Sequence, residues 1–288
     1  MNGLRLRACA KINLGLEVLR KRDDGYHDIN SLFIAIDLHD EISIHPADGI
    51  EVVCEPAVTD RPDDNLAARA AHTLGSLPSA HGQGAKITVA KQIPTGGGLG
   101  GGSSDAATTL VGLNRFWNFP ADDAALLAMA SSLGSDVPFF LQPSVALVQG
   151  RGDVITTIDI DLPFVVVLVV PGIHVSTPWA YSTLGITGEQ PATDLIRSLR
   201  QSIDDHQDMS HHFRNDFEPV VFAQHHVLSS IKQRFYEKGA AYASMSGSGS
   251  TMYGLYTDVD KARTAASAFG NMAVYICSPV NDSFVTSQ

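Results

Sequence analysis

A glycine-rich segment that runs directly into a helix-forming stretch constrains this chain more than any other feature. The segment "TGGGLGGGSSDAATTL" covers Thr95 to Leu110 and places six glycines within seven positions. The preceding residues, 85–94, alternate apolar and polar side chains as a strand does, and a helix is predicted from about Ser103 to Asn114. Each glycine loses more backbone entropy on folding than other residues do. Six of them between a strand and a helix therefore indicate a specific structural or functional role.

A loop of this kind is suited to binding an anion. Glycines let several backbone N–H groups approach the anion, and the helix adds the positive end of its dipole. Ser103 and Ser104 can cap the helix, and either hydroxyl could contact a phosphate or a metal ion. Asp105 would repel a phosphate unless a cation lies between them. The alternative interpretation is a structural turn or a linker.

The segment does not fit the commonest phosphate-binding motifs. No lysine follows the glycines, which excludes the Walker form, and the HRD and DFG sequences of protein kinases are absent. A G-x-G-x-x-G match at Gly96, Gly98 and Gly101 has little weight, because any glycine-dense stretch produces one. The pattern predicts a phosphate site without defining the class of nucleotide-binding protein.

Strands and helices interleave along the whole chain, which predicts an α/β or α+β fold. The valine-rich run Leu162–Gly172 is typical of a buried central strand. Asp64 or Asn65 is predicted to cap a helix that ends near Gly75. Other helices are expected at 121–134, 191–205, 217–239 and 258–270, and a glycine-broken hairpin at 240–257. Because the pattern of residues along the chain changes after residue 150, we predict two domains, 1–155 and 156–288.

The net charge and the cysteine content limit which binding partners and which cellular compartment are expected. The formal net charge of −11 argues against binding to nucleic acid or to an anionic membrane. Three separated cysteines without metal-ligand spacing, and no recognisable signal peptide or spanning segment, predict a cytoplasmic protein. The pairs His211–His212 and His225–His226 are interpreted as surface residues. We expect a small-molecule partner and a monomer or a weak homodimer.

Four segments taken together resemble the GHMP family of small-molecule kinases. They are "AKINLGLEV" (Ala10–Val18), "DGYHDINSLF" (Asp24–Phe33), "PTGGGLGGGSSDAA" (Pro94–Ala107) and "GSDVPFFL" (Gly134–Leu141). Weaker matches follow in the family's order at Gly150–Asp153, Ser176–Tyr181, Asn215–Glu218 and Met245–Gly254. The resemblance implies a two-domain kinase fold with the active site in the cleft between the domains, and ATP with Mg²⁺ as the phosphoryl donor.

The same resemblance assigns catalytic residues. It singles out Asp136 as the general base and places Lys11 beside it, where the ammonium would keep the carboxylate ionised. Asn13 would lie on the same strand face as Lys11 and hydrogen-bond the acceptor alcohol. From the residues alone, the favoured interpretations are that Asp136 is a helix cap and that Lys11 points to solvent. Ser135 and Asp153 depart from the residues more usual in the family.

The nucleotide site implied by the resemblance is built around the glycine loop. Lys91 and Asn65 match positions near the adenosine, although Asn65 is equally good as a helix cap. No acidic metal ligand is evident, so Mg²⁺ is expected on Ser103 or Ser104 with water completing the shell. The residues expected to hold the triphosphate are Pro94, Gly96, Gly97, Gly98, Leu99, Gly100, Gly101, Gly102, Ser103 and Ser104.

The segment "DGYHDI" narrows the acceptor, although by itself it could be a surface turn. The resemblance implies that Tyr26 and His27 recognise a cytidine and that Tyr181, rather than Trp179, is the facing ring of a stack. The implied reaction is ATP-dependent phosphorylation of the 2-hydroxyl of a cytidine-diphosphate-linked methylerythritol, in non-mevalonate isoprenoid synthesis. The alternatives are a GHMP kinase for mevalonate, homoserine or a sugar, a non-catalytic nucleotide-binding regulator, and a plain structural domain.

Overall fold

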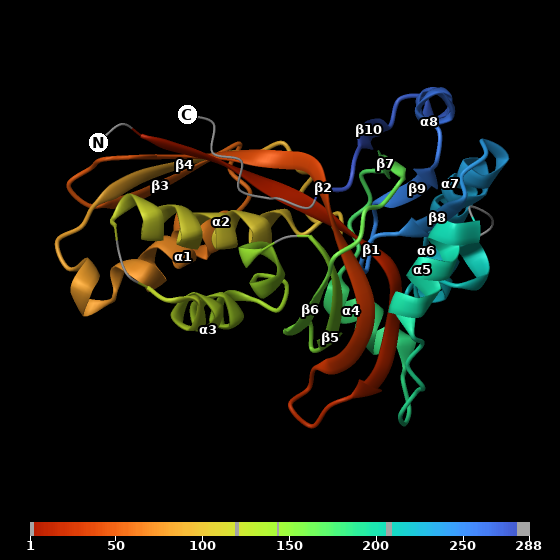
Figure 1. Cartoon of the computed structure of the whole chain (residues 1–288), viewed down its shortest axis with the longest axis horizontal. Coiled ribbons are helices and arrows are strands. Elements are labelled where there is room, and N and C mark those ends of the chain that lie inside the picture. The colour runs from red at the N-terminus through yellow and green to blue at the C-terminus, as the bar shows by residue number, and fades with distance from the viewer. Residues whose placement is uncertain (1–2, 119–120, 143, 206–208, 281–288) are drawn as a thin grey trace.

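Two β-sheets, each covered by helices, make up the fold, as the interleaved pattern predicts (Figure 1). The computed structural model describes residues 3–118, 121–142, 144–205 and 209–280. The first sheet has the order β3-β4-β2-β5-β6, with β1 also paired to β2, and only β3 and β4 are parallel. Its strands are β1 (Leu4–Lys21), β2 (His27–His45), β3 (Ile50–Glu55), β4 (Ala85–Ala90), β5 (Val145–Gly150) and β6 (Val154–Ile158).

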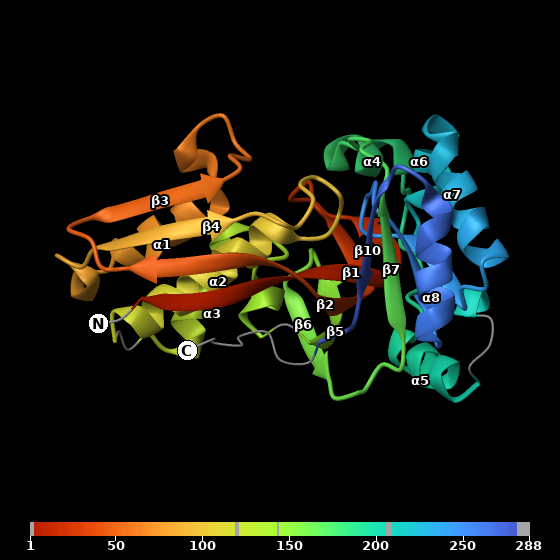
Figure 2. The ribbon, with the colours of Figure 1, turned by 90° about the horizontal axis from the view of Figure 1, so that it is seen from above.

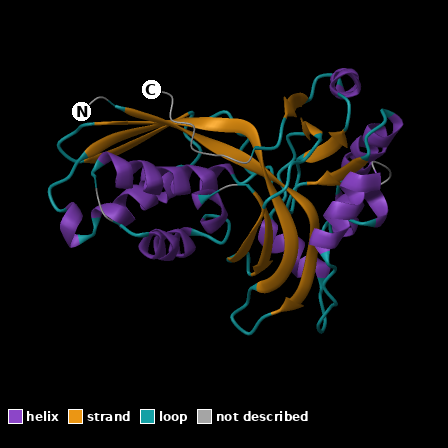
Figure 3. Cartoon of the chain, viewed as in Figure 1, coloured by secondary structure: helices purple, strands orange, loops and turns teal. Residues whose placement is uncertain are grey.

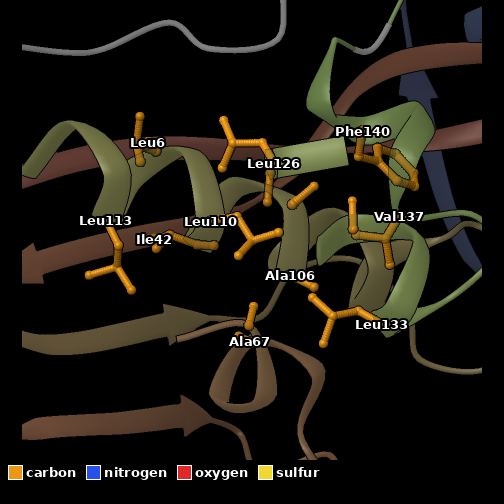
Figure 4. Close-up of a cluster of buried hydrophobic side chains, with 14 of the residues drawn as sticks. Leu6, Ile42, Ala67, Ala106, Leu110, Leu113, Leu126, Leu133, Val137 and Phe140 are labelled. Atoms are coloured by element: carbon orange, nitrogen blue, oxygen red, sulfur yellow. The ribbon is translucent and has the colours of Figure 1, made fainter. Parts of the chain in front are cut away.

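Helices α1, α2 and α3 pack beneath the first sheet (Figure 3). They enclose a core of alanine, leucine, isoleucine and phenylalanine side chains, in which Leu110 and Leu113 of α2 lie near Leu6 and Ile42 of the sheet (Figure 4). The many alanines of α1 and α2 let the two helices approach each other closely. The bounds of the three helices are α1 (Leu66–Gly75), α2 (Gly101–Phe116) and α3 (Asp123–Leu133).

The second sheet is antiparallel throughout and has the order β10-β7-β9-β8. The prediction of a buried central strand is confirmed, because β7 lies inside this sheet and its middle residues are buried. The predicted hairpin is β8 and β9. The strands are β7 (Val165–Val170), β8 (Tyr242–Met245), β9 (Met252–Tyr256) and β10 (Ala273–Cys277), and the helices are α4 (Thr177–Leu184), α5 (Leu195–Asp205), α6 (Glu218–Gln224), α7 (His226–Glu237) and α8 (Val259–Ala266).

The two halves of the molecule share the long hairpin of β1 and β2. Seen from above, these strands run out of the first sheet toward β7 and β10 (Figure 2). Ile12, Leu14 and Ile34 of this hairpin belong to the same buried cluster as Val166 and Leu168 of β7. The first sheet ends at Ile158 and the second begins at Val165, while the division at residue 155 stays a prediction.

Two predicted helices begin or end elsewhere. Helix α2 begins at Gly101, and its N-cap is Gly100 in the left-handed conformation with φ of 73°, so Ser103 and Ser104 lie in the first turn and are not caps. The predicted helix 217–239 is two helices, because the backbone leaves the helical conformation at His225. Helices 121–134 and 63–77 are confirmed within a few residues, with Asn65 as the cap of α1. No helix within the described part of the chain is long and apolar enough to cross a membrane.

Candidate active site

The glycine loop forms one wall of a cavity of about 280 Å³. Gly96, Gly98 and Gly100 all have positive φ angles, of 72°, 79° and 73°, a conformation that other residues adopt only with strain. At Gly98 a side chain is also excluded by space, since an added Cβ would lie 2.1 Å from the carbonyl oxygen of Ser246. Glycines are therefore needed both for the turn and for close packing.

Lys91 supplies the cation that the sequence requires beside Asp105. Its buried ammonium lies 2.7 Å from Asp105 Oδ2 and also contacts Asp40, whose other oxygen accepts the N–H of Gln92 and the N–H of Ile93. Burial raises the pKa of Asp105, an effect that the ammonium of Lys91 opposes. This buried cluster of Asp40, Lys91 and Asp105 joins the residue that follows β4 to β2 and to the N-terminal part of α2. Lys91 also lines the glycine-loop cavity.

Lys11 points into the protein and joins the glycine loop to the proposed base. The side chain is buried, and Nζ donates to Asn13 Oδ1 at 2.7 Å and to the carbonyl oxygen of Gly98 at 2.9 Å. Asp136 Oδ2 lies 3.8 Å from the same nitrogen. Burial lowers the pKa of Lys11, and the negative charge of Asp136 opposes this shift. The reading of Lys11 as a solvent-facing lysine is wrong.

Asp136 lies on the turn between α3 and the short helix Pro138–Leu141, and it faces a second cavity. This cavity has a volume of about 170 Å³, and Lys11, Asn13 and Gly98 line it as well. Asn13 is held from the other side, because its Nδ2 donates to Ser31 Oγ at 3.1 Å. A carboxylate, an ammonium and an amide thus converge on one small space next to the glycine loop.

Tyr181 and Phe217 line this second cavity, and His27 lies against Tyr181. The rings of His27 and Tyr181 stack with centroids 4.7 Å apart and an interplanar angle of 23°, and the edge of Phe217 supports Tyr181. Burial lowers the pKa of His27 and raises the pKa of Tyr181 to about 12. Tyr26 is 51 % exposed, and the guanidinium of Arg151 lies 5.4 Å from its ring centroid.

Other predicted residues are placed as follows. Asn65 caps α1, since its Oδ1 accepts the N–H of Ala67 at 2.8 Å. Ser103 lines the glycine-loop cavity, whereas Ser104 is buried. Trp179 packs against the apolar core of the second half. Among the described residues no group of three or more His, Cys, Asp and Glu side chains could hold a metal ion.

The loop Ser246–Ser250 between β8 and β9 also belongs to the site, although sequence reasoning gave it no role there. Gly247 and Ser248 line the second cavity, and Ser246 Oγ donates to the carbonyl oxygen of Gly98 at 2.9 Å. Ser248 Oγ pairs with Thr177 Oγ1 at 2.8 Å, which ties the loop to the helix that carries Tyr181. The available signal was the alternation "SGSGS", a second glycine-rich loop in the chain.

The site and the fold together define a small-molecule kinase, and comparison with known proteins confirms the class. The chain matches the GHMP kinases N terminal domain over residues 65–143 and the GHMP kinases C terminal domain over residues 193–273. The chain belongs to the GHMP kinase family.

Its relatives point to one member of this family. The 4-diphosphocytidyl-2-C-methyl-D-erythritol kinase of Geobacter sp. (strain M21) is 44 % identical over 269 residues, covering 92 % of this chain and 94 % of that protein. The same enzyme of Chlorobium phaeobacteroides (strain BS1) is 39 % identical over 272 residues, covering 93 % and 94 %. A crystal structure of 4-(cytidine 5'-diphospho)-2C-methyl-D-erythritol kinase aligns with a TM-score of 0.82 at 32 % identity, over 96 % of this chain and all of that one.

Homoserine kinase from Cytophaga hutchinsonii aligns with a TM-score of 0.71 at 16 % identity, over 100 % of this chain and 98 % of that one. At this level of identity the likeness shows the shared fold and nothing about the acceptor.

Proposed function

We propose that this protein transfers the γ-phosphoryl group of ATP to the 2-hydroxyl of 4-diphosphocytidyl-2-C-methyl-D-erythritol. The observation that carries the proposal is the position of Lys11, whose ammonium lies between the Gly98 carbonyl and the Asp136 carboxylate. It links the wall of the nucleotide cavity to the wall of the acceptor cavity. The curated relatives, which carry the name of this kinase, support the choice of acceptor.

The triphosphate would lie on the loop from Gly96 to Ser103, where backbone N–H groups and the N-terminus of α2 offset its charge. Mg²⁺ would arrive with the nucleotide and take most of its ligands from phosphate oxygens and water, as it prefers. Ser103 fits this role because it lines the cavity, whereas the burial of Ser104 counts against it. The ion would neutralise charge on the phosphates.

In the transfer itself the 2-hydroxyl oxygen would bond to the γ-phosphorus as the bond from that phosphorus to the ADP oxygen breaks. Asp136 would accept the hydroxyl proton, and Asn13 would orient the hydroxyl. The ammonium of Lys11, 3.8 Å from Asp136 Oδ2, would help to stabilise the hydroxyl oxygen as it loses its proton. Enclosure of these groups at one cavity strengthens each of these electrostatic interactions.

Tyr181, supported by Phe217, would be the fixed wall against which the cytosine stacks. His27 lies on one face of Tyr181, so we infer that this imidazole turns aside and donates to the base edge when the substrate binds. Tyr26 would close over the other face of the base. Lys91 and Asn65 remain candidates for the adenosine end of ATP, with Lys91 held by Asp40 and Asp105.

Nucleotide competition tests the choice of acceptor. CDP should compete with the acceptor and not with ATP, because the proposed cytosine site and the proposed ATP site would lie at different cavities. Competition with ATP alone would favour another GHMP kinase, acting on mevalonate, homoserine or a sugar. Binding of ATP without turnover of any alcohol would favour a non-catalytic regulator. The cytoplasmic location and the monomeric or weakly dimeric state stay predictions.

A further inference from the structure

The loop Ser246–Ser250 packs closely against the glycine loop, and hydrogen bonds from Ser246 and from the following Thr251 join the two. The N–H of Thr251 donates to the carbonyl oxygen of Gly97 at 3.2 Å, and Ser246 Oγ donates to the carbonyl oxygen of Gly98 at 2.9 Å. The Gly98 oxygen is the same atom that accepts from Lys11 Nζ. The position of this loop therefore affects both the nucleotide cavity and the ammonium beside Asp136.

Asn215 holds this loop from behind. Its side chain is 4 % exposed, and Nδ2 donates both of its hydrogens, to the carbonyl oxygens of Met245 and Gly247, each at 2.8 Å. Its Oδ1 accepts the N–H of Phe217 at 2.9 Å. Both donors and the acceptor oxygen of the amide thus have partners, and the two donated bonds span 30 and 32 residues of sequence. Buried donors of this kind are costly to lose, because the freed carbonyl oxygens find no water.

The backbone around Asn215 is itself attached to β1, the strand that carries Lys11 and Asn13. Leu16 N–H donates to the carbonyl oxygen of Arg214 at 2.7 Å, and Asp216 N–H donates to the carbonyl oxygen of Leu16 at 2.9 Å. Asp216 Oδ2 adds a further contact, from the N–H of Val18 at 2.8 Å. Residues 214–216 therefore pair alongside β1 at a parallel bridge between Leu16 and Asn215, and only Asn215 among them reaches the loop with its side chain.

We propose that Asn215 is a positioning residue for phosphoryl transfer, which fixes the distance between β1 and the loop Ser246–Ser250 and so sets where Gly98, Lys11 and Asp136 meet. The inference rests on the proposed function. Asn215 itself lines neither of the two cavities, and it acts through Gly247, which lines the second cavity, and through the adjacent Ser246. Misplacement of reacting groups by about 1 Å can cost about 100-fold in rate, so a small displacement of the loop is enough.

The test compares three variants. Asn215→Ala removes both N–H donors to the loop. Ser246→Ala removes the hydroxyl that joins the loop to the Gly98 carbonyl, the last contact in the relay from Asn215 through the loop to Gly98. Asp216→Ala is the matched control. The control loses the side-chain contact with Val18 N–H and the ion pair with Arg214, but it keeps both backbone hydrogen bonds of this segment to Leu16 and has no contact with the loop to lose. Two measurements are made on each, namely kcat and KM for both substrates, and hydrogen–deuterium exchange of the peptide that covers residues 244–251 without any substrate.

We expect Asn215→Ala to lower kcat by about tenfold to 100-fold, with both KM values within about threefold of wild type, since the loss is one of alignment in the transition state. Ser246→Ala should lower kcat in the same direction by a smaller factor, and Asp216→Ala should stay within about threefold. Exchange of residues 244–251 should become faster in Asn215→Ala and stay unchanged in Asp216→Ala.

Several results would overturn the proposal. These are unchanged exchange of residues 244–251 in folded Asn215→Ala, a wild-type kcat in that variant, or an equal loss of kcat in Asp216→Ala. If Asn215→Ala does not fold, a wild-type kcat in Ser246→Ala rejects the relay. A wild-type protein without turnover would reject the proposed function and the role in transfer together. In that case the exchange measurement still decides whether Asn215 holds the loop.

Discussion

Among single residues, Lys11 is the most informative about chemistry. The charge of a buried ammonium must be compensated by polar or negatively charged neighbours. Its ammonium has the Asn13 amide oxygen, the Gly98 carbonyl and the Asp136 carboxylate around it, and it lies 4.8 Å from the ring centroid of Phe33. Desolvation would otherwise favour the neutral amine. These contacts compensate a positive charge beside Asp136, where the proposed mechanism has a hydroxyl lose its proton.

Replacing that charge should cost activity more than stability. Lys11→Met places an apolar side chain of similar length in the same buried position but removes the positive charge beside Asp136, so we expect kcat to fall by about 100-fold. Steady-state assays of kcat beside thermal unfolding check this, with Lys86→Met as control, an exposed lysine paired with Glu51 on the surface. A kcat within about threefold of wild type would show that Lys11 only fills space.

Gly98 offers a second prediction at this scale. Gly98→Ala combines strain at φ of 79° with a clash against Ser246, so we expect loss of ATP binding and a lower midpoint of thermal unfolding. Gly82→Ala is the matched control, since Gly82 has φ of 82° and nothing within 4 Å of an added Cβ. It should show only the strain of about 1–2 kcal/mol. Equal behaviour of the two variants would mean that close packing of the loop is unimportant.

At the scale of elements, the cluster of Asp40, Lys91 and Asp105 joins β2, β4 and α2 beneath the glycine loop. Two carboxylates share one ammonium, and Asp105 Oδ1 is buried without a hydrogen-bond partner. The pKa of Asp105 is raised by burial from an ordinary value of 3.8 to about 7. Between these values the folded state holds a proton that the unfolded state has released, so stability falls as pH rises through this window.

The variant Asp105→Asn should lack this pH dependence. Relative to wild type, it should gain stability as pH rises from about 4 to about 8, because the amide has no charge to bury. Unfolding midpoints of both proteins across this range give the difference directly, and Lys91 stays paired with Asp40 in the variant. A difference that is the same at every pH would show that Asp105 ionises in the folded protein as it does in the unfolded chain.

The sequence allowed prediction of those elements whose cause is local. Glycines before a helix, Asn65 as a cap and the valines of β7 act over a few residues, and all three features appear in the structure. Contacts that depend on how distant parts of the chain pack together could not be predicted from the sequence. The inward direction of Lys11, and the contacts of Asn215 with the loop Ser246–Ser250, follow from how β1 meets the second half of the chain. No local pattern contains that information.

For the molecule as a whole, the shared hairpin of β1 and β2 makes the two halves depend on each other. The buried cluster beneath β7 is completed by Ala10, Ile12 and Leu14 from β1. We expect residues 156–288 expressed alone not to fold, since the missing strands would leave this apolar surface open to water. Circular dichroism and amide NMR spectra of the fragment check this. A cooperative unfolding transition in the fragment would contradict it and establish an autonomous domain.

The central claim is that Asp136 accepts a proton from the hydroxyl of a cytidine-diphosphate-linked polyol. The most direct test is ATP consumption with Mg²⁺ and 4-diphosphocytidyl-2-C-methyl-D-erythritol, for wild type and Asp136→Asn. We predict turnover by wild type and a fall of at least about 100-fold in the variant, with ATP binding kept. Full turnover by the folded variant would contradict the role of Asp136, and an inactive, well-folded wild type would contradict the acceptor.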